Sequence, residues 1–187
     1  MGWIACDGAR ACAPSQMRDL TMADKTLDTL FHDTLKDIYY AERKILKSLP
    51  KMARAAQSPE LKAAFEKHKG QTEGQIERLQ QVFELIGKPA RGKTCDAIEG
   101  ILAEGDEIME EYKDTPALDA GLLAAAQAVE HYEITRYGTL KRWALVLGLK
   151  DAAALLDETL QEEAQTDEDL TGIADAAVNT DAMKTAA

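Results

Sequence analysis

The sequence predicts an all-α protein, an antiparallel four-helix bundle with an additional helix in the long crossover between two helical pairs. Between Thr26 and about Ile173 the apolar residues recur every three or four positions, which is the period of helices that bury one face. No convincing run alternates apolar and polar residues as a half-buried strand would. The lengths of the connections indicate the order of packing, because short turns join neighbouring antiparallel helices.

The first two helices are predicted from their apolar stripes and their end signals. The first helix ends near Gln57, with Pro50 expected to bend its last turns. Ser58-Pro59 is a capping side chain followed by proline at the first helical position, and Gly87 with Pro89 closes the second helix. The first stripe consists of Leu27, Leu30, Phe31, Leu35, Ile38, Ile45, Leu46 and Leu49, and the second of Leu61, Phe65, Ile76, Leu79, Phe83 and Ile86.

Three further helices complete the bundle. The third is predicted from near Thr94, the fourth from Thr115-Pro116 to Gly148, and the fifth from Asp151. Helices one and two form one hairpin, helices four and five form another, and the third helix lies in the connection between them. This connectivity is that of a ferritin-like bundle.

One domain is expected from 187 residues with 45% hydrophobic content. Residues 1–21 lack a signal peptide pattern and are predicted to be a disordered extension, residues 22–175 form the helical domain, and residues 176–187 form a disordered tail. The three cysteines, Cys6, Cys12 and Cys95, cannot all pair within one chain, so a reducing cytoplasm is the expected compartment. A redox clip between Cys6 and Cys12 is the alternative.

The charge balance restricts the partners. There are 33 acidic residues and 22 basic ones, which gives a net charge of -11. Nucleic acid and anionic lipid surfaces would repel such a chain, so neither nucleic acid nor a membrane is expected as a partner. No stretch approaches the roughly 20 apolar residues of a membrane span. Small molecules, cations and other proteins remain.

Several polar residues fall where the helical period demands a buried side chain. Glu42 lies on the inward stripe of the first helix, and His68 and Thr72 lie on that of the second. The candidate metal ligands chosen from these stripes are Glu42, His68, Glu130, Glu133, Glu163 and Asp167. His32 and His131 flank the stripes, and the acids of the third helix, such as Glu104, lie beside its stripe.

Burying several carboxylates without compensation is prohibitively costly, so each needs a cation nearby or a raised pKa. Few lysines or arginines lie on these stripes. Iron and manganese ions prefer carboxylate oxygens with an imidazole, and four helices that point acids inward can hold two such ions. The sequence therefore predicts a site for two iron or manganese ions per chain. Any single acid could instead belong to a solvated face.

Four segments together resemble the YciE/YciF family of bacterial ferritin-like stress proteins. They are Leu35 to Glu42, Leu49 to Ala53, Glu130 to Ile134 with Tyr137 to Leu140, and Leu160 to Glu163 with Asp167. The resemblance covers roughly Lys25 to Ala174. It implies a rubrerythrin-related bundle that is usually a homodimer, linked to stress responses and to stress-related protein partners.

The resemblance also implies which residues match a rubrerythrin-type site. Glu42 matches the glutamate of the first helix, and Glu130 with Glu133 resembles the paired glutamates of the third bundle helix. The two Glu-x-x-His motifs do not carry over intact, because Phe65 precedes His68 and Thr166 follows Glu163.

Three functions compete at this point. The first is a metal-binding protein that handles peroxide, oxygen or iron, with Tyr137 as a neighbouring redox or hydrogen-bonding group. The second is a metal-free structural or binding protein that dimerises through the bundle, which the missing second histidine favours. The third, an iron-storing or DNA-protecting cage, is disfavoured by the net charge of -11.

Overall fold

The first two helices begin at side chains that cap them, Thr26 and Ser58. The computed structural model describes residues 25–184, and the predictions for residues 1–21 and for Cys6 and Cys12 lie outside this range. The main elements are α1 (Leu27–Ala55), α2 (Pro59–Leu85), α3 (Asp96–Glu111), α4 (Leu118–Val146) and α5 (Lys150–Ile173). The described residues contain no β-strand, so the all-α prediction is confirmed.

The turn between α1 and α2 is closed by side chains. Ser58 Oγ accepts a hydrogen bond from the Leu61 amide, as expected for a helix that starts at Ser58-Pro59. Asp119, near the start of α4, accepts hydrogen bonds from the amides of Gln57 at 2.8 Å and Ser58 at 2.5 Å. A nearly buried carboxylate therefore ties the α1–α2 turn to the first turn of α4.

The fourth helix begins later than the sequence predicted. Thr115 and Pro116 belong to the preceding turn, and α4 starts at Leu118. The Thr115 hydroxyl donates to the Tyr112 carbonyl at 2.7 Å, so it stabilises the end of α3 and does not cap α4. Asp114 in this turn has a positive φ of 59°, a left-handed conformation that cannot continue a helix.

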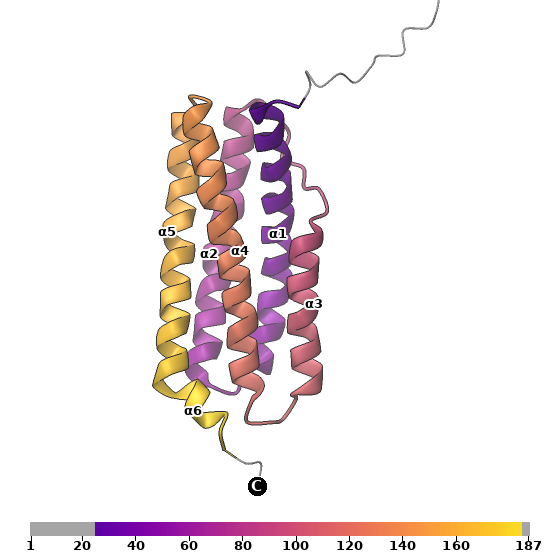
Figure 1. Cartoon of the computed structure of the whole chain (residues 1–187), viewed down its shortest axis with the longest axis vertical. Coiled ribbons are helices and arrows are strands. Elements are labelled where there is room, and N and C mark those ends of the chain that lie inside the picture. Colours follow the sequence, from indigo (N-terminus) through magenta and orange to yellow (C-terminus); the bar gives the residue numbers. More distant parts are fainter. Residues whose placement is uncertain (1–24, 185–187) are drawn as a thin grey trace, which may run out of the picture.

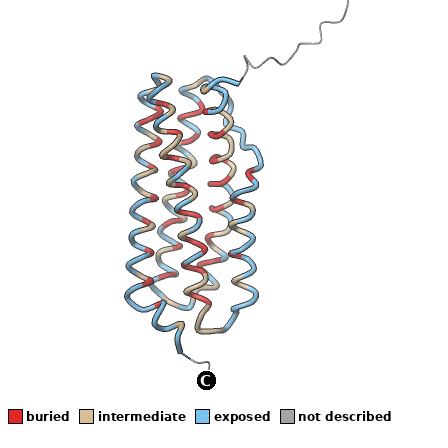
Figure 2. The backbone as a smooth tube through the Cα atoms, in the orientation of Figure 1, coloured by how far each residue is buried: buried red, intermediate tan, exposed pale blue. Residues whose placement is uncertain are grey.

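The long helices pack around a shared interior (Figure 1). Helix α1 packs against α2 and α4, and α5 packs against the same two helices, so these four surround one apolar core. Helix α3 packs against α1 and α4 from outside. Only Ile98 and Gly105 of α3 are buried, and its acids face solvent or lysines of α1. Buried residues follow the inner faces of the helices in Figure 2.

The C-terminal region differs from the disordered tail predicted from residue 176. A π-helical turn (Ala174–Val178) and a short helix α6 (Asn179–Asp181) follow α5. Ala174 and Val178 are buried, and this turn packs against α4 and α5. Two small apolar side chains thus continue the α5 stripe past residue 175. Among the helices of residues 25–184, none has the length and apolar character to cross a bilayer.

Candidate metal centre

Five of the six predicted ligands meet inside the bundle. Glu42 comes from α1, His68 from α2, Glu130 and Glu133 from α4, and Glu163 from α5, and each side chain is buried. His68, Glu130, Glu133 and Glu163 can each offer one ligand atom, and these atoms all lie within 4.8 Å of one another. We call these four residues together with Glu42 the cluster.

Helical spacing explains why these side chains converge. Glu130 and Glu133 are three residues apart, so both lie on the inner face of α4. Buried Ala126 precedes them by one turn and buried Tyr137 follows them by one turn. The same face therefore changes from apolar to acidic for about one turn and then becomes apolar again.

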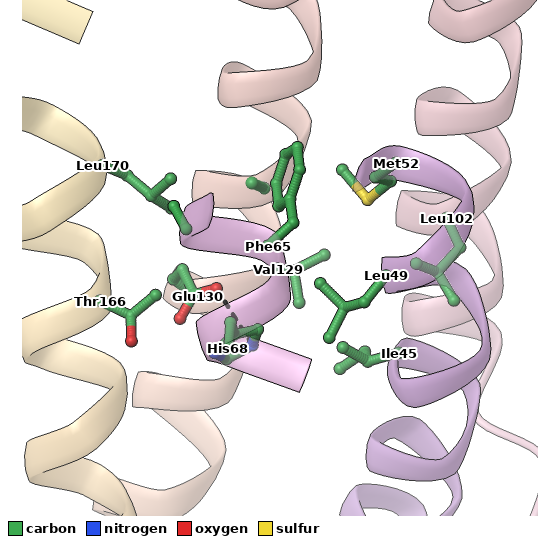
Figure 3. A pocket seen from close by; sticks show the side chains of 12 residues that line it. Ile45, Leu49, Met52, Phe65, His68, Leu102, Val129, Glu130, Thr166 and Leu170 are labelled. Carbon is green, nitrogen blue, oxygen red and sulfur yellow. Dashed lines mark ion pairs between the residues drawn. The ribbon is translucent and has the colours of Figure 1, made fainter. Parts of the chain in front are cut away.

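His68 lies near two of the four carboxyl groups, those of Glu130 and Glu163. Its Nε2 atom lies 3.4 Å from Glu130 Oε1, the contact drawn as a dashed line in Figure 3. Its Nδ1 atom lies 4.0 Å from Glu163 Oε2. Burial, together with a smaller effect of charge repulsion from Lys67, lowers the pKa of His68 to about 4. The imidazole is therefore neutral near pH 7 and can offer a nitrogen lone pair.

Glu42 is held by a tyrosine. The Tyr137 hydroxyl donates a hydrogen bond to Glu42 Oε1 inside the bundle. Burial raises the pKa of Glu42 to about 7, although the hydrogen bond from Tyr137 and the neighbouring Glu133 carboxyl act in the opposite direction. Burial, with the charges of Glu42 and Glu133, raises the pKa of the Tyr137 hydroxyl well above its usual value. Tyr137 thus keeps its proton and fixes the orientation of Glu42.

The other three carboxyl groups also resist ionisation. Burial raises the pKa of Glu130 to about 8, and the charges of Glu42 and Asp167 act in the same direction. Burial is also the largest cause of the pKa shifts of Glu133 and Glu163, which lie well above the usual value; the charge of Glu42 is second for both. A shared cation would oppose these shifts, because it favours the ionised form of every carboxyl group around it.

The cluster is short of hydrogen-bond partners. Within residues 25–184, both oxygens of Glu133 and Glu163, one oxygen each of Glu42 and Glu130, and both ring nitrogens of His68 have no donor or acceptor. Buried polar atoms are almost always paired. The Glu133 carboxyl lies close enough to Glu42 to share a proton with it, as does that of Glu163 with Glu130. Such protons or bound cations would satisfy these atoms.

Asp167 does not join the cluster, so its placement on the inward stripe of α5 was wrong. It is partly exposed, accepts a hydrogen bond from Gln127 Nε2 at 3.1 Å, and lies 3.3 Å from Nε2 of the exposed His131. The buried residue of that turn is Thr166, whose hydroxyl donates to the Glu162 carbonyl. The α5 stripe advances by three and then four residues from Leu156, which selects Thr166 and not Asp167.

Sequence reasoning also missed a polar layer beside the cluster. Gln75 is completely buried and donates to Glu162 Oε2 at 3.1 Å, and its own Oε1 has no partner among the described residues. Arg78 pairs with Glu158 and Glu162 and donates to Thr159 Oγ1 at 3.0 Å. The spacing of Phe65, His68, Thr72 and Leu79 could have identified Gln75, which lies three residues after Thr72 and four before Leu79.

The donor set suits a hard or borderline cation. Carboxylate oxygens with one neutral imidazole are typical ligands of iron and manganese, and several carboxylates on facing helices can bridge two such ions. The cluster lacks the thiolates and additional imidazoles of most structural zinc sites. The residues present therefore fit a carboxylate-rich metal pair.

Comparisons with known proteins identify relatives along most of the chain. Residues 26–183 match the family model described as a domain of unknown function (DUF892). Protein YciF of Escherichia coli (strain K12) is 44% identical over 151 residues, which cover 80% of this chain and 91% of YciF.

Solved structures agree with these matches. The crystal structure of the E. coli stress protein YciF has a TM-score of 0.79 and 44% identity, over 83% of this chain and 98% of that one. YcfI from Rhodopseudomonas palustris, a proposed structural protein, has a TM-score of 0.77 and 44% identity, over 83% and 96%. A protein from Xanthomonas campestris, at 24% identity and a TM-score of 0.65 over 83% and 96%, shares the fold.

Proposed function

This chain belongs to the family of YciF-like proteins that the DUF892 model describes, and from that membership we propose that it is a ferritin-like, stress-associated protein that binds two iron or manganese ions in the cluster. The function that follows is the handling of peroxide, oxygen or iron. The name of YciF as a stress protein supports the link to stress.

The observation that carries the proposal is the charge of the buried cluster. Four carboxyl groups converge without a lysine or arginine side chain between them, and most of their oxygens have no partner within residues 25–184. The nearby Arg78 is already paired with Glu158 and Glu162. Two divalent cations would balance four carboxylates and satisfy the unpartnered oxygens, at a depth where unpaired negative charges would be strongly destabilising.

The residues have distinct tasks in this proposal. His68, Glu130, Glu133 and Glu163 are close enough to hold one ion in common, and Glu42 beside Glu133 extends the set toward a second ion. Tyr137 holds Glu42 in place through its hydrogen bond. Bound iron or manganese would supply redox and Lewis-acid chemistry. The surrounding apolar side chains would keep bulk water from the ions.

The architecture supports the same assignment. Helices α1, α2, α4 and α5 surround the cluster, and α3 lies in the connection between the two hairpins, which is the wiring of ferritin-like bundles. We propose a homodimer in the cytoplasm, on the basis of the family resemblance and the cysteine content. Light scattering of the purified protein tests the dimer, and a monomer at micromolar concentration would contradict it.

A metal-free structural or binding role is the second candidate. It is favoured by the single histidine of the cluster and by the two carboxyl pairs, Glu42 with Glu133 and Glu130 with Glu163, which can share protons. The naming of YcfI as a proposed structural protein points in the same direction. In this role the raised carboxyl pKa values would keep the cluster neutral without a cation.

Metal analysis of protein purified without chelators separates the two candidates. We expect about two equivalents of iron or manganese per chain, because about two divalent ions balance the carboxylates. Glu130→Ala should lower the metal content sharply, and His68→Ala should lower it less, because carboxylates alone hold hard cations. Glu104→Ala, an exposed acid of α3, is the control and should keep it. Full metal content in Glu130→Ala, or none in the wild type after loading, would favour the structural role.

A further inference from the structure

A small cavity lies directly beside the cluster, on the side of His68 and Glu130 (Figure 3). Its volume is about 20 Å³, which is room for about one water-sized or diatomic molecule. The remaining wall is apolar apart from Thr166, and includes Ile45, Leu49 and Leu170. The cavity is therefore an apolar chamber that borders the polar cluster on one side.

The sequence creates this chamber at identifiable positions. Phe65 lies one turn before His68, at the position of the glutamate in the Glu-x-x-His motif of rubrerythrin-type sites, and its ring forms part of the wall. Ala64 and Ala126 also line the cavity, and their short side chains leave space that a larger residue would fill. The departure from the Glu-x-x-His pattern thus replaces a carboxylate next to His68 with an apolar surface.

The polar atoms in the wall are poor hosts for a water molecule. A buried water needs two to four polar partners. The Thr166 hydroxyl already donates to the Glu162 carbonyl at 3.0 Å. The inference rests on the proposed function, in which the ligand atoms of His68 and Glu130 bind the metal ions. In the metal-free chain the His68 nitrogens still face carboxyl oxygens of the cluster, Nε2 at 3.4 Å from Glu130 Oε1 and Nδ1 at 4.0 Å from Glu163 Oε2. The chamber then offers dispersion contacts and few hydrogen bonds, conditions under which apolar cavities stay dry and take up apolar guests.

We propose that this cavity is a binding site for one small, uncharged apolar molecule of the size of dioxygen. The molecule lies against His68 and Glu130 and contacts the side chains of Ile45, Leu49 and Leu170. It is thereby held next to the cluster without occupying a ligand position. Ions and larger organic molecules are excluded, because the wall is apolar and the volume accommodates a single small guest.

Xenon is the probe, and the full metal-free chain is the sample. Methyl-resolved NMR under increasing xenon pressure should give saturable shifts at Ile45, Leu49 and Leu170, while the buried Leu140 and Leu156, outside the cavity wall, should not move. Dioxygen in place of xenon should enhance relaxation of the same methyl groups. Equal responses at all five residues, no response, or an ordered water in the cavity would overturn the proposal.

A filled cavity provides the matched test. Ala126→Val adds two methyl groups at the wall and should abolish the saturable xenon shifts. Ala124→Val makes the same change two residues earlier at an exposed position of α4 and should leave them intact. If Ala126→Val does not fold, Ala64→Val fills the cavity from α2. Shifts that persist in a folded filled variant would contradict the site. Metal content is measured separately, so failure of xenon binding is distinguishable from failure of the metal proposal.

Discussion

Helices α3 and α4 pack side by side, yet Glu99 of α3 and Glu130 of α4 behave in opposite ways. Glu99 of α3 is 41% exposed, lies 2.6 Å from Lys44 and accepts the Tyr40 hydroxyl. Hydrogen bonds from Lys44 and then Tyr40 lower its pKa. Glu130 of α4 is buried, and burial raises its pKa to about 8. Position relative to the core, and not the residue type, determines the proton affinity.

The comparison separates two uses of a carboxylate. On α3 the acids meet solvent and lysines, so ionisation costs little and each pair contributes little to stability. On the inner faces of α1, α4 and α5 the acids meet one another, so ionisation is costly until cations arrive. Cations should therefore act on the α4 acids and leave those of α3 unaffected, which the following predictions test.

Metal loading should have the largest effect. With free iron(II) or manganese(II) at about 1,000 times the dissociation constant, binding to the folded state adds about 4 kcal/mol. For a chain of this length the midpoint should rise by roughly 10 °C. Scanning calorimetry with and without the ion checks this. Glu104→Gln on α3 should show the same rise, and an unchanged wild-type midpoint would show that the cluster does not bind the ion.

Glu133→Gln should stabilise the metal-free protein and weaken its binding of metal. Glu133 is completely buried, and its oxygens have no partner within residues 25–184. The amide removes a buried acidic group, so the metal-free variant should be about 1–3 kcal/mol more stable than the metal-free wild type at pH 8. It should also bind less metal. Urea unfolding of both metal-free proteins provides the comparison, and destabilisation at pH 8 would contradict this account.

The metal-free protein should lose stability as pH rises from 6.5 to 8. The pKa values of Glu42 and Glu130 are raised from 4.5 to about 7 and about 8, so the folded state keeps protons that the unfolded chain has released. Each such proton contributes about 1.4 kcal/mol per pH unit, with stability falling toward high pH. His68, with its pKa lowered to about 4, acts in the opposite direction only below 6.5.

Chemical denaturation across this range measures the slope. Glu130→Gln removes one of the buried carboxyl groups with a raised pKa and should reduce the slope, whereas Glu99→Gln should not. A metal-free stability that rises from pH 6.5 to 8 would contradict the raised carboxyl pKa values.

Glu99→Gln should have the smallest effect. The side chain lies at the surface between Lys44 and Tyr40. Exposed ion pairs contribute about 0–1 kcal/mol, so the loss of stability should fall within that range and shrink in high salt. Metal content should not change. A loss of several kcal/mol would mean that α3 contributes buried charge as α4 does.

Much of the fold and the site was accessible from the helical period alone. The inward positions of Glu42, His68, Glu130 and Glu133 followed from apolar neighbours three and four residues away, and all four are buried. Glu163 followed in the same way. The periodic signal was clear where apolar side chains flank a polar position on the stripe, as Ile38 and Ile45 flank Glu42.

The misses have a common physical origin. On α5 the true stripe passes through Thr159 and Thr166, which are small and polar, while Leu160 and Asp167 stand one position later and attracted the assignment. On α2 the partly exposed Ile76 was preferred to the buried Gln75 for the same reason. In both helices the residue type was given more weight than the helical period. The polar side chains are buried by contacts with distant parts of the chain, and a single sequence does not reveal such contacts.

Anomalous diffraction from crystals loaded with iron(II) or manganese(II) tests the central claim most directly. Data on either side of the metal absorption edge should give two peaks among Glu42, His68, Glu130, Glu133 and Glu163, and no peak at Asp167 or along α3. Loaded crystals in which these five side chains are ordered and no anomalous peak lies among them would contradict the account, and the carboxyl groups would then be held by shared protons.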